Sequence, residues 1–258
     1  MVQADENKKT TIIRLYGSLN DFIPHNLRQR SLLCYFKGNP NIKDTIESVG
    51  VPHPEIQLIL FNGEPVTFNK PMEQDARISV YPFFHQIDVS YVHLVNPKPY
   101  DELKFMLDVH LGKLAKYLRF AGFDCLLIPF LDDHGIVSEG TRDNRIILSR
   151  DIGLLKHKRV KYGYWLRSQI PEEQFKEVVQ HFRIKEQDLN SCQRCTTCNG
   201  KIKSIEKYNI IKDLKPGTKK YFDEFFQCQN CGRVYWKGSH YQRMRQWLER
   251  AIISVYGE

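Results

Sequence analysis

The chain has 258 residues and carries 38 Lys and Arg against 30 Asp and Glu, which gives a formal net charge of +8. With 41% hydrophobic residues it has a globular composition, which excludes disordered and collagen-like proteins. No apolar run approaches the roughly 20 residues of a membrane span, and the N-terminus lacks the apolar core of a signal peptide. The sequence predicts a cytoplasmic, non-membrane protein of two or three domains.

The first hundred residues show the order strand, strand, helix, strand, strand. After a flexible N-terminus over residues 1–10, we expect strands at 12–16, 32–36, 56–61 and 77–81, and a helix over 41–50. This order predicts a β-grasp domain over residues 11–95, which resembles the ubiquitin-like sulfur carriers. Those carriers act through a free C-terminal Gly-Gly, whereas this chain continues through Tyr81-Pro82-Phe83-Phe84. We therefore interpret the domain as a docking or RNA-positioning module.

The middle of the chain alternates strands with helices. Strands are predicted at residues 103–107, 123–128, 144–149 and 162–166, with helices over 111–121, after 133 and from 171. This alternation is typical of a parallel α/β sheet, and we place that domain at residues 103–190. Ligands of such sheets bind outside the carboxyl ends of the strands.

Acidic residues stand where that binding edge is predicted. Asp108 and Asp151 follow the first and third strands, and Asp132-Asp133 lead into a helix. Carboxylates that converge on one point need cations, and such oxygen ligands suit Mg²⁺ or Mn²⁺, which can activate water toward a phosphodiester. The alternative is that each acid is a helix cap or turn residue. No glycine-rich phosphate loop follows these strands, which disfavours nucleotide cofactors.

Five of the seven cysteines lie between residues 192 and 231. The pairs Cys195-x-x-Cys198 and Cys228-x-x-Cys231 have the spacing of a four-thiolate site for structural zinc. Disulfides are the alternative, and Cys192 could replace one of the ligands because Cys192-x-x-Cys195 has the same spacing. We assign this segment, residues 191–258, to a zinc ribbon with a C-terminal helix.

The positive charge is concentrated in the same segment. Residues 1–100 have a net charge of 0, residues 101–190 of +1 and residues 191–258 of +7. Basic residues alternate there with aromatic ones, a pattern that favours RNA because cations contact phosphates and rings stack on bases. The alternative is a solvated, non-binding face.

Several motifs in order resemble the Mut-seven C-terminal RNase family, a PIN-like nuclease domain with a zinc ribbon. They are Phe105-Met106-Leu107-Asp108, the run Leu111 to Arg119, Asp132-Asp133, Ile146 to Asp151, and the two cysteine motifs with their flanks. The likeness covers roughly residues 103–247, and a ubiquitin-like domain ahead of it is a known architecture of the family.

The resemblance implies a fold class and a site. The fold would be α/β: a PIN-like parallel sheet domain preceded by a β-grasp domain and followed by a zinc ribbon. Asp108, Asp133 and Asp151 match the PIN carboxylates, and Asp132 and Glu139 are additional candidates. PIN nucleases usually carry another acid on a helix between the first and third, and no clear equivalent is present.

These observations predict a metal-dependent ribonuclease that acts on RNA, such as tRNA or another structured RNA. Mg²⁺ or Mn²⁺ would bind the catalytic carboxylates, and zinc would be structural. The residues expected to hold RNA are Lys113, Lys116, Arg119, Arg150, Arg233 and Lys237. The alternative is a non-catalytic RNA- or ribosome-binding adaptor with a degenerate PIN-like domain, as the missing helix acid would favour.

Overall fold

The computed structural model describes residues 8–84, 92, 94–96, 102–191 and 193–257. The chain forms two compact units, one of residues 1–102 with 151–165 and the other of residues 103–150 with 166–258. Compactness alone does not show which segments fold by themselves, so the predicted ranges 11–95, 103–190 and 191–258 stay predictions. In the predicted flexible N-terminus, positions 1–7 lie outside the described residues, and the first strand begins at Lys9.

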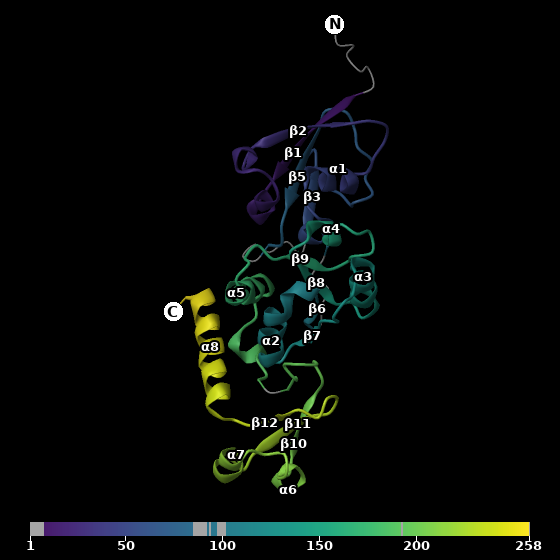
Figure 1. Ribbon diagram of the computed structural model, residues 1–258. Coiled ribbons are helices and arrows are strands. Elements are labelled where there is room, and N and C mark those ends of the chain that lie inside the picture. Colours follow the sequence, from purple (N-terminus) through teal and green to yellow (C-terminus); the bar gives the residue numbers. More distant parts are fainter. Residues whose placement is uncertain (1–7, 85–91, 93, 97–101, 192, 258) are drawn as a thin grey trace. The chain divides into compact units, whose positions relative to one another are not determined.

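The N-terminal part of the first unit is a mixed five-stranded sheet with one helix (Figure 1). The strands are β1 (Lys9–Leu15), β2 (Ser31–Phe36), β3 (Leu58–Phe61), β4 (Glu64–Pro65) and β5 (Ala76–Tyr81), in the order β2-β1-β5-β3-β4. β1 and β5 pair in parallel, and the other neighbours are antiparallel. Helix α1 (Ile42–Val49) begins at Asn41, whose side chain accepts a hydrogen bond from the N–H of Asp44. The predicted β-grasp arrangement is confirmed.

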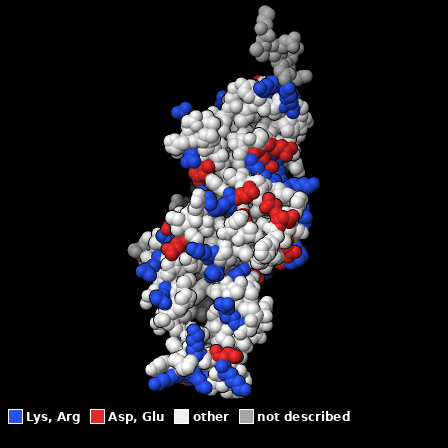
Figure 2. All heavy atoms as spheres, viewed as in Figure 1, with Lys and Arg blue, Asp and Glu red and all other residues white. Residues whose placement is uncertain are grey.

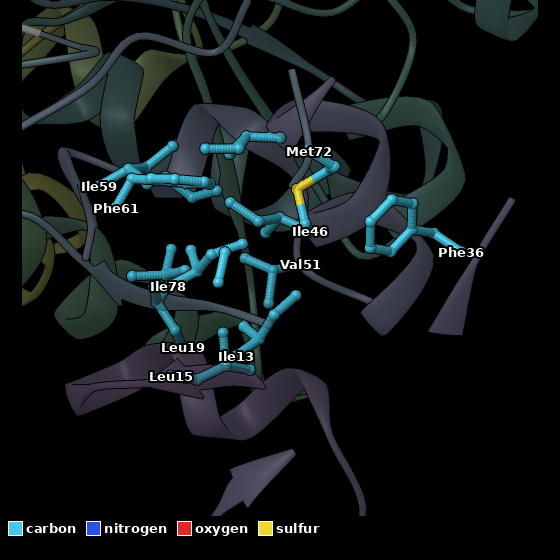
Figure 3. Close-up of a cluster of buried hydrophobic side chains, with 14 of the residues drawn as sticks. Ile13, Leu15, Leu19, Phe36, Ile46, Val51, Ile59, Phe61, Met72 and Ile78 are labelled. Atoms are coloured by element: carbon cyan, nitrogen blue, oxygen red, sulfur yellow. The ribbon is translucent and has the colours of Figure 1, made fainter. Parts of the chain in front are cut away.

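A single hydrophobic core holds this sheet and helix together. Alternate side chains of β1, including Ile13 and Leu15, point inward and are buried, as a half-buried strand requires. Ile46 of α1 meets them together with Ile59 and Ile78 from β3 and β5, as Figure 3 shows. The turn from β3 to β4 uses Asn62 and Gly63 with positive φ angles, as predicted from the Asn-Gly pair.

The segment from 151 to 165 also belongs to the first unit. It contains α4 (Ile152–Leu155) and β9 (Gly163–Trp165), and β9 packs against the 3₁₀ turn η3 (His53–Glu55). The His53 ring is buried, with Nδ1 2.7 Å from a Glu47 carboxylate oxygen and Nε2 2.6 Å from the Val160 carbonyl oxygen. The N–H of Trp165 donates to the buried carboxylate of Glu55 at 2.6 Å. These contacts anchor the segment to the β-grasp sheet.

The second unit is built on parallel strands covered by helices on both faces. β6 (Lys104–Leu107) pairs in parallel with β7 (Asp124–Leu126) on one side and β8 (Ile146–Ser149) on the other. Helix α3 (Asp133–Arg142) packs against β6 and β8, and it comes so close that a Cβ at Gly140 would lie 2.9 Å from Cγ1 of Ile147. The predicted parallel α/β sheet is confirmed.

Three further helices pack together in the same unit (Figure 1). They are α2 (Gly112–Phe120), α5 (Pro171–Phe182) and α8 (Ser239–Tyr256), and α5 contacts both of the others. The Trp247 ring of α8 stacks on Tyr117 of α2 with centroids 4.2 Å apart and approaches Phe175 of α5 at 5.2 Å. This aromatic cluster fixes the C-terminal helix.

The remaining elements form a small antiparallel sheet near the cysteines. It consists of β10 (Ile202–Ile205), β11 (Phe225–Cys228) and β12 (Val234–Tyr235), with helices α6 (Lys207–Ile210) and α7 (Pro216–Tyr221) between β10 and β11. Short 3₁₀ turns occupy Gly17–Phe22, His25–Leu27, Val109–Leu111 and Glu186–Asp188. No helix in the described part of the chain is long and apolar enough to cross a membrane.

His53→Ala tests the anchor of the 151–165 segment. The substitution removes two buried hydrogen-bond partners, so we expect the free energy of unfolding to fall by about 1–3 kcal/mol in denaturant titration. His25→Ala is the control, because His25 is exposed, and it should change stability by less than about 0.5 kcal/mol. Equal stability of the two variants would show that the anchor contributes nothing.

Candidate metal centre and carboxylate site

Four of the five clustered cysteines meet at one point. The Sγ atoms of Cys195, Cys198, Cys228 and Cys231 all lie within 4.8 Å of one another. The Cys195–Cys231 and Cys198–Cys228 sulfur separations are 3.6 and 3.4 Å, far longer than the roughly 2.05 Å of a disulfide. Tetrahedral zinc with bonds of about 2.3 Å places its sulfurs about 3.8 Å apart. The arrangement is that of a structural zinc site, and the alternative ligand Cys192 lies outside the described residues.

Each cysteine pair sits on a tight turn. In the second turn Gly232 has a φ of 72°, a left-handed backbone conformation that glycine adopts without steric cost. In the first turn the residue with positive φ is Asn199, at 67°, and not the glycine that follows it. Gly200 is needed for space instead, because a Cβ there would lie 2.8 Å from Sγ of Cys228.

Hydrogen bonds and burial give the thiols of this cluster different pKa values. Burial alone would raise the pKa of Cys195, but the hydroxyl of Tyr235, 3.0 Å from its sulfur, and nearby backbone N–H groups lower it to about 6. Burial and the neighbouring sulfurs raise the pKa of Cys198 to about 12. Thiolates are the metal ligands, so zinc binding must displace protons from the cluster.

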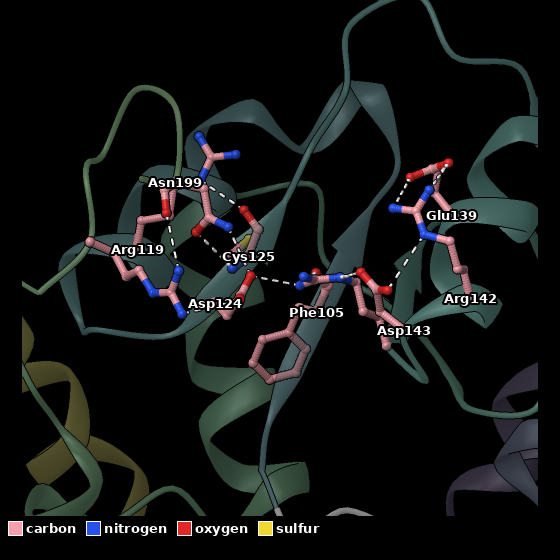
Figure 4. Close-up of polar contacts among 10 residues, drawn as sticks. Phe105, Arg119, Asp124, Cys125, Glu139, Arg142, Asp143 and Asn199 are labelled. Carbon is pink, nitrogen blue, oxygen red and sulfur yellow. Dashed lines mark hydrogen bonds and ion pairs between the residues drawn. The ribbon is translucent and has the colours of Figure 1, made fainter. Parts of the chain in front are cut away.

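Arg119 connects the first cysteine turn to the parallel sheet (Figure 4). Its guanidinium donates to the carbonyl of Cys125 in β7 at 2.8 Å and to the carbonyls of Thr197 and Thr196 at 2.9 and 3.3 Å. The side chain is buried, with the residue only 5% exposed. The burial of Arg119 argues against the expectation that it contacts RNA: it lies on the inner side of α2, and its Nε and Nη1 groups donate to backbone carbonyls.

A largely buried carboxylate completes the same connection: the side chain of Asp124 is 13% exposed. Asp124 accepts hydrogen bonds from Arg145 at 2.6 Å, from Arg194 at 3.1 Å and from the side-chain amide of Asn199 at 2.8 Å. Asn199 in turn accepts from the N–H of Cys125. Burial would raise the pKa of Asp124, but the Arg145 and Asn199 hydrogen bonds and the two guanidinium charges outweigh it and hold that pKa below its usual value. One acid thus links the α/β sheet to the cysteine turn.

Asp108 stands at the end of β6, where the sequence places it. One of its oxygens accepts from the N–H of His110 at 3.2 Å, and the other accepts from the hydroxyl of Ser149 at 2.9 Å. Ser149 is the last residue of β8, and the N–H of Asp108 donates to the Leu148 carbonyl. The carboxyl ends of two adjacent parallel strands therefore meet at the Asp108 side chain.

The other three acids begin helices. Asp132 is the N-cap of α3 and accepts from the N–H of Gly135 at 2.8 Å, while Asp133 is the first residue of that helix. Asp151 caps α4 and accepts from the N–H of Gly153 at 2.6 Å. All three are exposed, and capping uses one oxygen each of Asp132 and Asp151.

The carboxylates do not form a ready-made metal cage. Within the residues that the structure describes, the four cysteines are the only group of three or more His, Cys, Asp or Glu with ligand atoms within 4.8 Å. Asp108 and Asp132 lie in the second unit and Asp151 in the first. The additional candidate Glu139 pairs with Arg142 on the surface of α3.

The remaining basic candidates are all exposed. Lys113 and Lys116 lie on the outer side of α2, and Arg150 follows β8. Arg233 lies beside β12, and Lys237 forms an exposed ion pair with Glu224 at 3.3 Å. Figure 2 shows many Lys and Arg side chains over the α6 and α7 end of the second unit.

Comparison with protein-family models decides the family. The Mut7-C RNAse domain matches residues 103–248, more than half of the chain, and the Mut7-C ubiquitin model matches residues 8–88. The chain belongs to the Mut7-C RNase family. Membership implies a ribonuclease with RNA as its substrate. Comparison with curated proteins and with solved structures finds no match.

The residues that join the Mut7-C α/β sheet to the cysteine turns were not predicted. Asp124, Asn199 and Tyr235 are polar residues whose partners are as many as 75 positions away, and their spacing carries no periodic signal. A weak signal exists for Asp124, since an acid inside an apolar strand needs a buried cation.

Metal analysis tests the cysteine cluster. The protein should contain about one equivalent of zinc, and Cys228→Ser should lose it because a three-sulfur site binds zinc more weakly. Cys34→Ser should keep the metal, because Cys34 lies in β2 of the first unit. Full zinc retention by Cys228→Ser would refute the ligand set.

Asp124→Asn tests the buried link. The side chains of Asp124 and Arg145 are only 13% and 10% exposed, so the substitution should lower the free energy of unfolding by about 3 kcal/mol at pH 7. Because the folded pKa lies below the usual 3.8, this stabilisation is complete above that pH and disappears as pH falls through the lower folded value. The difference between wild type and variant should therefore vanish only in strong acid.

Asp143→Asn is the matched control for that measurement. Asp143 contacts the same Arg145 at 3.3 Å, but its side chain is 39% exposed. We expect a loss below about 1 kcal/mol. Equal losses for the two aspartates would contradict a special role for Asp124.

Proposed function

We propose that this protein is a metal-dependent ribonuclease that hydrolyses RNA phosphodiester bonds at the carboxyl edge of the parallel sheet. The observation that carries the proposal is the match of residues 103–248 to the Mut7-C RNAse domain. The position of Asp108 supports it, because ligands of parallel sheets bind outside the carboxyl ends of the strands, and the ends of β6 and β8 meet there.

Asp108, Asp133 and Asp151, with Asp132 as an additional ligand, would hold Mg²⁺ or Mn²⁺. The donors suit these ions, which take carboxylate oxygens and keep several waters, so a complete protein cage is not required. When bound, such an ion lowers the pKa of a water and stabilises charge on the phosphate. One oxygen of the Asp132 side chain accepts the hydrogen bond that caps α3, and the other oxygen is left for a metal or its waters.

The protein's own groups would orient the site and the RNA. The Ser149 hydroxyl donates to one Asp108 oxygen and so holds that carboxylate in one orientation. Lys113 and Lys116 on α2 and Arg150 after β8 would contact phosphates, and the +7 of the C-terminal segment would extend this track. Structured RNA, including tRNA, is the proposed substrate class.

One observation favours the alternative, an RNA- or ribosome-binding adaptor. No three carboxylates of the described residues bring their oxygens within 4.8 Å of one another. An adaptor would bind RNA with the same affinity whether or not Mn²⁺ is present, whereas the nuclease needs the ion for cleavage.

Cleavage assays test the proposal. Purified protein should cut structured RNA in the presence of Mn²⁺ or Mg²⁺, and the double variant Asp108→Asn, Asp151→Asn should cut it at least about 100-fold more slowly. Asparagine still accepts the capping hydrogen bonds that both aspartates make, so the fold is kept while the charges are removed.

The control is Glu173→Gln, an exposed acid in the first turn of α5 that should leave the rate unchanged. Zinc content and melting temperature should be equal in all three proteins. Undiminished cleavage by the double variant would refute the carboxylate site, and RNA binding with no cleavage under any metal would favour the adaptor.

A further inference from the structure

A cavity of about 400 Å³ lies in the second unit, beside the cysteine turns. It is lined by the end of α2, by β10 and β12, and by the first turn of α8. Its volume lies in the range of small-molecule sites, which is about 300–1,000 Å³. None of the carboxylates proposed for catalysis lines it, so it is a separate site.

Aromatic rings dominate this lining. Phe120 of α2 and Tyr241 of α8 pair with ring centroids 5.7 Å apart, and Trp236 is 38% exposed. The Trp236 indole lies so close to the backbone that a Cβ on Gly238 would be 2.8 Å from Nε1. Phe225 supports the indole from within the ribbon at 6.5 Å. The cavity thus presents a large ring that is held in place yet open to solvent.

The charged residues of the lining are all basic. Arg194 and Arg233 line the cavity with His240, and no Asp or Glu in the described part of the chain does. Asp124 already neutralises Arg194, whereas the exposed Arg233 side chain has no hydrogen bond or ion pair to the described residues. Arg233 is therefore available for an external anion, and Trp236, which lines the same cavity, supplies a flat surface.

We propose that this cavity binds one unpaired nucleotide of the RNA, with the base against Trp236 and a phosphate against Arg233. A positive groove with aromatic surfaces is the usual way to hold single strands, since every base has a face that stacks and every linkage has a charge. A base inside a duplex is already stacked on its neighbours and cannot enter. The proposal rests on RNA being the substrate and assigns to the ribbon the selection of unpaired segments.

Binding is tested apart from cleavage by using the Asp108→Asn, Asp151→Asn protein throughout. A fluorescein-labelled 12-nucleotide single strand should bind at least about tenfold more tightly than the same sequence in a blunt RNA duplex. Trp236→Ala should weaken single-strand binding about tenfold and leave duplex binding unchanged. Trp236→Phe, which keeps a ring, should recover part of the loss.

Arg233→Ala provides the second variant, which does not depend on the packing of Trp236. Because it removes one phosphate contact, the slope of log affinity against log salt should fall by about 0.7. Lys220→Ala, an exposed basic residue of α7 outside the lining, is the matched control and should leave the single-strand preference unchanged. Each variant must contain one equivalent of zinc and have the same melting temperature as the parent protein.

The results separate this proposal from the proposed function. If Trp236→Ala loses the preference for single strands and Arg233→Ala lowers the salt slope while no RNA is ever cleaved, the nucleotide site stands and the nuclease proposal fails. If zinc-loaded Trp236→Ala and Arg233→Ala bind single strands as the parent does, with the same salt slope, the nucleotide site is refuted whatever the cleavage result. Self-association that only Trp236→Ala abolishes would refute it too, by identifying a second copy as the occupant.

Discussion

The ion pairs of the largely buried Asp124 carboxylate are the interaction on which the second unit depends. An acid removed from water is stable only when cations and donors surround it, and here the guanidinium groups of Arg145 and Arg194 and the amide of Asn199 do so. Arg145 directly precedes β8 of the parallel sheet, while Arg194 and Asn199 flank the Cys195-x-x-Cys198 pair of the first cysteine turn. With Arg119 they make the ribbon an integral part of the nuclease unit, not a tethered module.

The cysteine cluster contacts the short segment that also lines the proposed nucleotide cavity. The Tyr235 hydroxyl lies 3.0 Å from the sulfur of Cys195, and Tyr235 also lines the proposed nucleotide cavity. Arg233 and Trp236, which line the same cavity, lie within two residues of Tyr235 in the sequence. A structural metal at the four cysteines would therefore support the proposed nucleotide cavity, because it would fix the backbone that carries Arg233 and Trp236.

In the first unit, residues that are far apart in the sequence pack together. Residues 151–165 follow a strand of the second unit but belong to the first, where His53 and Glu55 bind Val160 and Trp165. The β-grasp sheet thus holds the segment that begins with Asp151. This gives the ubiquitin-like domain a structural function that does not need the terminal Gly-Gly of the sulfur carriers.

Local patterns in the sequence were enough for the main strands and helices of residues 11–190, the fold class and the four-cysteine cluster, but not for β4, α4 or the strands and short helices between the cysteine pairs. Strand alternation, the Asn41 cap and the paired C-x-x-C spacing each depend on residues close in sequence, so they can be read without a structure. The burial of individual side chains and the hydrogen bonds between distant residues could not be predicted from local patterns. They depend on which faces of the strands and helices pack against one another. Only the tertiary structure decided that Arg119 is buried beneath the cysteine turn and that Asp124 is a buried link. The division of the basic residues into buried and exposed ones is therefore decided by the fold.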